Sequence, residues 1–108
     1  VEVLEDILEN HKGEKIEDEA LLKQAELLVE QQNYEGAEFN YQKIVEFYGD
    51  GILADDAHFA LGELYEKTLN EPEKAKAHYE KIIYNYQDSY YFPQARKNFR
   101  RLRGDAIN

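Results

Sequence analysis

The sequence contains no cysteine, no methionine, no tryptophan and only two prolines. The absence of cysteine excludes disulfides, thiolate metal sites and cysteine nucleophiles, and it fits either a reducing or an oxidising compartment. No stretch approaches the roughly 18 apolar residues that suggest a membrane span. There is no signal-peptide pattern, and the chain begins at Val1 within what reads as a helix. We therefore expect a fragment of a longer protein.

The residue patterns of common catalytic and cofactor sites are also absent. The six glycines form no G-x-S-x-G, P-loop or G-x-G-x-x-G motif, and no pair of carboxylates stands out as a general acid and base. The three histidines, His11, His58 and His78, fall on three different predicted elements without an i, i+4 pair. These absences predict no enzymatic activity, no metal site and no cofactor, and they favour packing or surface roles for the histidines.

The charge is strongly acidic. There are 23 Asp and Glu against 13 Lys and Arg, a net charge of −10. This balance argues against a general affinity for nucleic acid or anionic lipid. The exception is the basic segment 92–103, for which we favour a solvated cap or a contact with an acidic partner. RNA binding through this segment remains an alternative.

The chain repeats itself at an offset of 38 residues, and a register shortened by one residue extends the match upstream. The matching residues are small, aromatic or aliphatic, which is the pattern of a structural repeat. The pairs are Ala37 with Ala75, Tyr41 with Tyr79, Ile44 with Ile82, Tyr48 with Tyr86, Asp50 with Asp88 and Ala57 with Ala95. At the shorter offset of 37, Leu4, Ile7, Leu8, His11 and Ala20 precede Tyr41, Ile44, Val45, Tyr48 and Ala57.

Apolar residues within each repeat recur at helical spacing. This periodicity predicts helices at about 1–10, 17–31, 34–47, 53–69, 72–86 and 91–103, with no strand. Asn33, Asn70 and the pair Asp88-Ser89 are candidate N-caps, and Gly49-Asp50-Gly51 separates two helices.

The segment AHFALGELYEKTLNEPEKAKAHYEKIIYNY resembles the tetratricopeptide repeat. Its first helix carries Leu61, Gly62 and Tyr65, and its second carries Ala75, Tyr79 and Ile82; the preceding repeat carries Gln24, Ala25, Leu28, Ala37, Tyr41 and Ile44. The small residues allow the two helices to approach closely. The resemblance implies an all-α, right-handed α-α superhelix of about six helices.

Two features depart from the common pattern. The second repeat is one residue longer, which we attribute to its turn, and Tyr-Gly-Asp or Tyr-Gln-Asp-Ser replaces the usual proline after the second helix. That ending resembles bacterial cell-envelope members of the outer-membrane assembly lipoprotein and Tol-Pal-associated type. The resemblance implies a periplasmic or envelope location, with the cytoplasm as the alternative.

The resemblance divides the chain into four parts. Residues 1–16 match the second helix of a truncated repeat with its turn, 17–51 and 52–89 are two repeats, and 90–108 form a solvating C-terminal helix. The apolar face of residues 1–10 then lacks its partner helix. We expect further repeats before it, or self-association through this half repeat.

The family's concave groove implies a non-catalytic scaffold that binds other proteins, as the C-terminal part of a larger bacterial protein. The implied groove residues are Glu19, Leu22, Glu26, Glu30, Asp56, Phe59, Glu63, Glu66, Lys97 and Arg101. The Lys and Asn with which chaperone-binding members hold a C-terminal carboxylate are replaced at four matching places, among them Glu26 and Glu63. An acidic groove with two apolar anchors favours a basic segment as partner. The alternative is a purely structural cap whose binding surface lies upstream.

Overall fold

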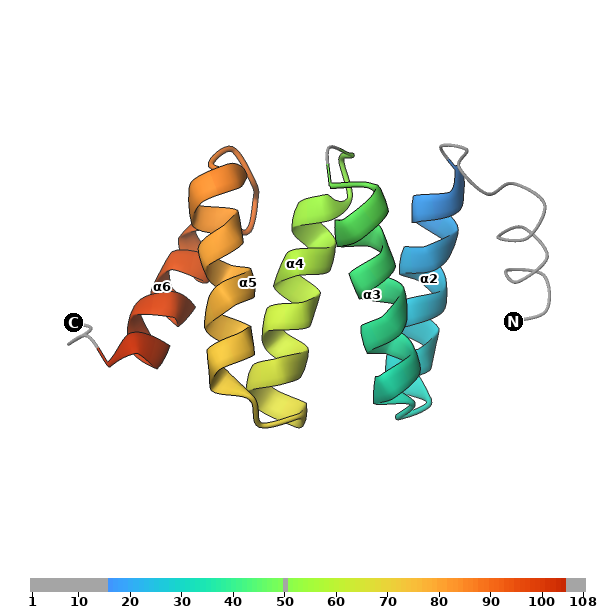
Figure 1. Ribbon diagram of the computed structural model, residues 1–108, viewed down its shortest axis with the longest axis horizontal. Helices are drawn as coiled ribbons and strands as arrows, with labels where there is room; N and C mark the ends of the chain where they lie inside the picture. Colours follow the sequence, from blue (N-terminus) through green and yellow to red (C-terminus); the bar gives the residue numbers. More distant parts are fainter. Residues whose placement is uncertain (1–15, 50, 105–108) are drawn as a thin grey trace. The chain divides into compact units, whose positions relative to one another are not determined.

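The computed structural model describes residues 16–49 and 51–104, and all regular structure within these ranges is helical (Figure 1). The chain separates into two compact units, residues 1–57 and 58–108, each of which is described by itself. The elements are α2 (Ile16–Glu30), α3 (Tyr34–Phe47), α4 (Ala54–Glu63), the π-helix η1 (Leu64–Thr68), α5 (Pro72–Asn85) and α6 (Phe92–Arg103). The all-α prediction is confirmed, and these helices lie within one residue of their predicted bounds. The helix predicted for residues 1–10 lies outside the described residues.

In the first unit, α2 and α3 pack side by side as a helical hairpin (Figure 1). Leu21 and Ala25 of α2 and Ala37 of α3 are buried at its interface. The two alanines leave no side chain long enough to separate the helices. A buried hydrogen bond also links the two helices, since Asn40 of α3 donates from Nδ2 to Gln24 Oε1 of α2 at 2.6 Å.

In the second unit, α5 packs against η1 and α6. Tyr79 of α5 is fully buried and lies against Gly62 of α4. A Cβ at position 62 would stand 2.5 Å from Cε1 of the Tyr79 ring, so only glycine permits this approach. The glycine is therefore required by packing, since no positive φ is recorded there.

The extra residue of the second repeat lies in a π-helical turn, so its attribution to the connecting turn is wrong. The connection between the two helices is 31–33 in the first repeat and 69–71 in the second, which makes both three residues long. The π turn instead closes with a bond from the Leu69 N–H to the Leu64 carbonyl at 2.9 Å. One residue inserted into an α-helix commonly takes this form because it leaves the flanking helix intact.

The connections share a conformation as well as a length. Their middle residues, Gln32 and Asn70, have φ of 62° and 54°. Asn70 therefore ends the preceding helix, and its prediction as an N-cap is wrong, since Glu71 holds that place without a side-chain cap bond. Asn33, in contrast, caps α3 as predicted by accepting from the Gly36 N–H at 3.1 Å.

The prediction of an N-cap at Asp88-Ser89 is also wrong. The N-cap of α6 is Tyr91, which makes no side-chain cap bond. Ser89 Oγ accepts from the Tyr91 N–H at 3.0 Å and so shapes the turn before the helix. The serine is therefore a turn residue.

Deleting Lys67 from the π turn should be well tolerated. The deletion converts η1 into α-helix and reproduces the length of the first repeat, so we expect the melting temperature to change by less than about 5 °C. Thermal unfolding followed by circular dichroism measures this. Deletion of Lys81, which is also exposed, is the control, because it rotates the rest of α5 and removes Ile82 from the core. Equal destabilisation by both deletions would show that the π turn is required for folding.

Candidate protein-binding surface

In the first unit, the predicted groove residues of α2 form one exposed stripe. Glu19, Glu26 and Glu30 follow helical spacing and are exposed, and Lys23 lies among them. Leu22 is half-buried beside the stripe. The opposite face of α2 carries the buried Leu21 and Ala25. No ion pair within the described residues neutralises Glu26 or Glu30, so α2 presents uncompensated negative charge.

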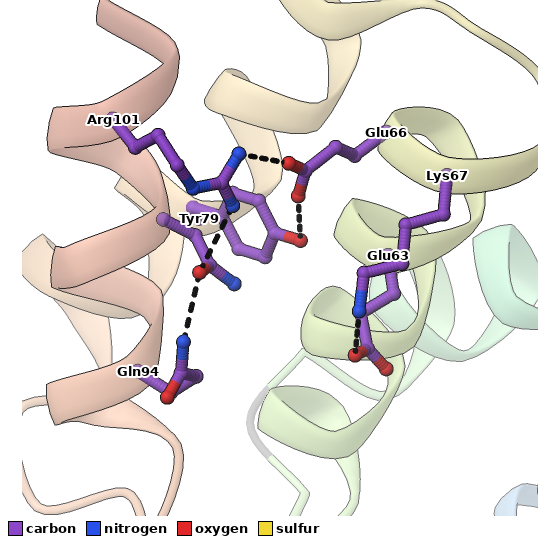
Figure 2. Close-up of polar contacts among 7 residues, drawn as sticks. Glu63, Glu66, Lys67, Tyr79, Gln94 and Arg101 are labelled. Carbon is purple, nitrogen blue, oxygen red and sulfur yellow. Dashed lines mark hydrogen bonds and ion pairs between the residues drawn. The ribbon is translucent and has the colours of Figure 1, made fainter.

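The second unit differs because its predicted groove carboxylates already have partners. Glu63 forms an ion pair with Lys67 one turn later, at 3.1 Å. Glu66, in the π turn, forms an ion pair with Arg101 of α6 and accepts a hydrogen bond from the Tyr79 hydroxyl at 3.0 Å (Figure 2). The Glu66 side chain is 12% exposed and the Arg101 side chain 48%, so the cation is the accessible member of that pair.

Two amides of α6 complete this network. Asn98 is buried, and its Oδ1 accepts from Arg101 at 3.2 Å and from Gln94 Nε2 at 2.9 Å. Figure 2 shows Arg101 reaching Glu66 beside the Tyr79 ring, with Gln94 on the same helix as Arg101. Because Arg101 is held by two acceptors from different helices, the network orients its guanidinium and links α6 to η1.

The network shifts the titration of its members. Burial of Glu66 opposes its ionisation, but hydrogen bonds from Arg101 and Tyr79 outweigh burial and lower the pKa of this carboxyl. Burial, followed by the hydrogen bond to Glu66, raises the pKa of the Tyr79 hydroxyl. Glu66 therefore stays a carboxylate near neutral pH, and its charge is compensated within the unit.

The predicted aromatic anchor, Phe59, is partly covered by other rings. It stacks on Tyr91, with the ring centroids 4.6 Å apart, and lies 5.8 Å from Tyr79. Phe59 is half-buried as a result. Phe59 is therefore part of a small aromatic cluster with Tyr79 and Tyr91.

Within the second unit, the structure brings Glu66 and Arg101 of the predicted groove set directly together. Lys97 is exposed on α6, one turn before Arg101. Asp56 is half-buried in the first turn of α4. Sequence reasoning included Glu66 and Arg101 among the groove residues. It did not foresee that the two would bond to each other, or that Tyr79, Asn98 and Gln94 would belong to the same hydrogen-bond network.

A histidine pair was also missed. His58 and His78 lie with their Nδ1 atoms 3.0 Å apart, although they are 20 residues apart in the chain. The repeat offsets contained the signal, since these positions correspond to Leu21 and Asn40, and the Asn40 side chain bonds to the Leu21 carbonyl at 3.4 Å. Within the described ranges, no three His, Cys, Asp or Glu residues are arranged to hold a metal ion.

No helix in the described part of the chain has the length and apolar character needed to cross a membrane. Comparison with known families matches the tetratricopeptide repeat over residues 19–51 and again over 56–89. These two matches together cover more than half of the sequence. No significant match was found among curated proteins or among solved structures. The paired helices and the two family matches agree, and the chain belongs to the tetratricopeptide-repeat family, whose repeats generally mediate protein–protein interaction.

Proposed function

We propose that this chain is a non-catalytic scaffold segment that binds other proteins, and that α2 binds a basic peptide segment. The observation that carries the proposal is the exposed acidic stripe of α2, in which Glu19, Glu26 and Glu30 flank the half-buried Leu22. A partner with Lys or Arg opposite the stripe and an apolar residue opposite Leu22 complements it in charge and in hydrophobicity.

Two of the carboxylates expected to make the groove acidic are already paired with cations of the same unit. Glu63 is paired with Lys67, and Glu66 is paired with Arg101. A basic partner therefore gains less from these carboxylates, because it would have to displace a cation that is already bound. Among the predicted groove carboxylates of the described residues, Glu26 and Glu30 of α2 are left without an ion pair.

Reversing one charge of the stripe should weaken binding of a basic peptide. We expect Glu26→Lys to lower the affinity for a lysine-containing amphipathic peptide about fivefold, since attraction becomes repulsion at an exposed site. Fluorescence anisotropy with that peptide, and with a counterpart carrying glutamate for lysine, measures the effect at fixed ionic strength.

The matched control is Glu46→Lys on α3, which makes the same charge change at an exposed residue outside the stripe. It should leave the affinity within about twofold of the unchanged protein. Equal weakening by both substitutions would reduce the effect to net charge, and equal binding of the two peptides would overturn the proposed partner chemistry.

A structural role for the last helix is the second candidate function, and the end of α6 supports it. Its C-cap, Gly104, has φ of 94°, and its N–H bonds back to the carbonyls of the last turn. Three arginines in that turn, Arg100, Arg101 and Arg103, complement the helix dipole. In this alternative, the segment closes a repeat array and its working surface lies upstream. The bacterial envelope setting stays a prediction, which detection of the native protein in fractionated cells would test.

A further inference from the structure

Helix α6 has a second face, on the side away from the Glu66 network. Phe99 and Arg103 lie on this face and, with Lys76, Ala77 and two glutamates of α5, line a hollow of about 250 Å³. The glutamates are Glu73, which forms an ion pair with Lys76 at 2.8 Å, and Glu80. The Arg103 guanidinium lies 5.1 Å from the centre of the Phe99 ring. The hollow is therefore lined by two apolar and four charged side chains.

The repeat alignment identifies this face as one that a second helix covers elsewhere in the chain. Ala95 of α6 corresponds to Ala57 of α4, and both are fully buried. At the same offset, Phe99 corresponds to Leu61 and Arg103 to Tyr65. Leu61 and Tyr65 are buried, whereas Phe99 is half-buried and Arg103 exposed. No helix in the described residues covers Phe99 and Ala77 at the hollow.

The basic residues of α6 indicate the charge of a helix that could pack at the hollow. The helix contains Arg96, Lys97, Arg100, Arg101 and Arg103 and no acidic residue, so it carries +5 while the rest of the chain of net charge −10 carries −15. Arg96 and Arg103 lie on the side of Phe99 by helical spacing. An acidic amphipathic helix would therefore be attracted to the α6 side of the hollow, where Arg96 and Arg103 lie.

One segment of this chain has that chemistry and the matching place in the repeat. Residues 1–10, VEVLEDILEN, carry four acidic and no basic residues, and Val1, Leu4 and Leu8 recur at helical spacing. Leu4, Ile7 and Leu8 align with Tyr41, Ile44 and Val45 of α3, which is the second helix of its repeat. The segment thus corresponds to the type of helix that would follow α6.

We propose that residues 1–10 of one copy of this chain pack on α6 and α5 of a second copy at this hollow, so that the chains associate head to tail. The contact joins two different surfaces, so in a pair of chains each chain keeps one of them free. Such an interface extends until it closes on itself, so the assembly is not limited to a dimer. This inference goes beyond the proposed peptide-binding function, because it concerns α5 and α6 and not the acidic stripe of α2.

Sedimentation velocity of the 108-residue chain over a range of about 5 to 200 µM tests the proposal. We expect the average mass to rise with concentration and the rise to diminish between about 0.1 and 0.5 M salt, because the contact is largely electrostatic. A monomer at every concentration would overturn the proposal. So would RNA or anionic vesicles binding to α6 in the absence of self-association.

Charge reversal then locates the contact. Arg96→Glu/Arg103→Glu and Glu2→Lys/Glu5→Lys should each weaken association by at least about tenfold, while an equimolar mixture of the two should regain it. Lys43→Glu/Lys74→Glu is the control for net charge, since it changes two lysines outside α6, and it should associate like the unchanged chain. Association of either charge-reversed variant at the original strength, or failure of the mixture to recover it, would overturn the head-to-tail contact.

Discussion

Replacing Gly62 by valine should lower the free energy of unfolding by about 3 kcal/mol, because it overpacks a buried site. A Cβ at this position would lie 2.5 Å from Cε1 and 2.8 Å from Cδ1 and Cζ of the Tyr79 ring. Tyr79 is fully buried and its hydroxyl is bonded to Glu66, so the ring cannot move aside without breaking that bond. Urea unfolding measures the loss, and the melting temperature should fall by at least about 10 °C.

The control for this substitution is Ala60→Val, on the same helix at a half-exposed site. It introduces the same β-branched side chain away from Tyr79 and should cost less than about 1 kcal/mol. Removing the ring provides a second check, since Gly62→Val should cost less in a Tyr79→Leu background. If the two valine variants were equally stable, the close approach at Gly62 would not limit the packing of α4 against α5.

The second large effect is a loss of stability on acidification caused by His78. Burial, with a smaller contribution from Lys81, lowers the pKa of His78 from 6.5 to about 4. Between about pH 6.5 and pH 4, His78 is therefore protonated in the unfolded chain and largely neutral in the folded chain. The stabilising contribution is present above about pH 6.5 and is lost as the pH falls toward 4, with a full size of about 3 kcal/mol.

The residues at the matching places of the first repeat suggest a variant that should lack this sensitivity to acid. Leu21 and Asn40 occupy the places of His58 and His78, so His58→Leu/His78→Asn transfers a pair that already packs in this chain. Urea unfolding at pH 7 and at pH 4 should show a smaller loss for the variant, by about 3 kcal/mol. Equal losses would mean that carboxylates, and not His78, determine the acid sensitivity.

The fold was largely predictable because the pattern that specifies it is local. Helical spacing and the match between Ala37 and Ala75 depend on which residues face a neighbouring helix, and the repeat presents that information twice. The prediction that Asn33 caps α3 also succeeded, because a cap involves only residues close in sequence. The predictions that Asn70 and Asp88-Ser89 are N-caps failed, because the backbone conformation of each turn determines which residue occupies the cap position.

The candidate site was less predictable, because its properties depend on distant residues. Sequence placed Glu66 and Arg101 on the groove face, but 35 residues separate them and nothing in the spacing indicated that they would pair. The same applies to Asn98, whose burial turns an ordinary amide into an acceptor shared by two side chains. Pairing of Glu63 and Glu66 with cations therefore removes part of the negative charge that the family resemblance led us to expect on the groove face.

By itself, the sequence determined the family, the bounds of the helices, the small residues at their contacts and the absence of cysteine chemistry. These follow from periodicity and composition, which are complete in the chain before it folds. Only the tertiary structure decided that the additional residue forms a π turn and that His58 lies against His78. It also decided that Glu66 forms an ion pair, whereas Glu26 forms none within the described residues. The π turn is a choice among backbone hydrogen bonds that the apolar spacing does not encode. The side-chain pairs depend on distances between different helices or turns, which exist only once the helices have packed.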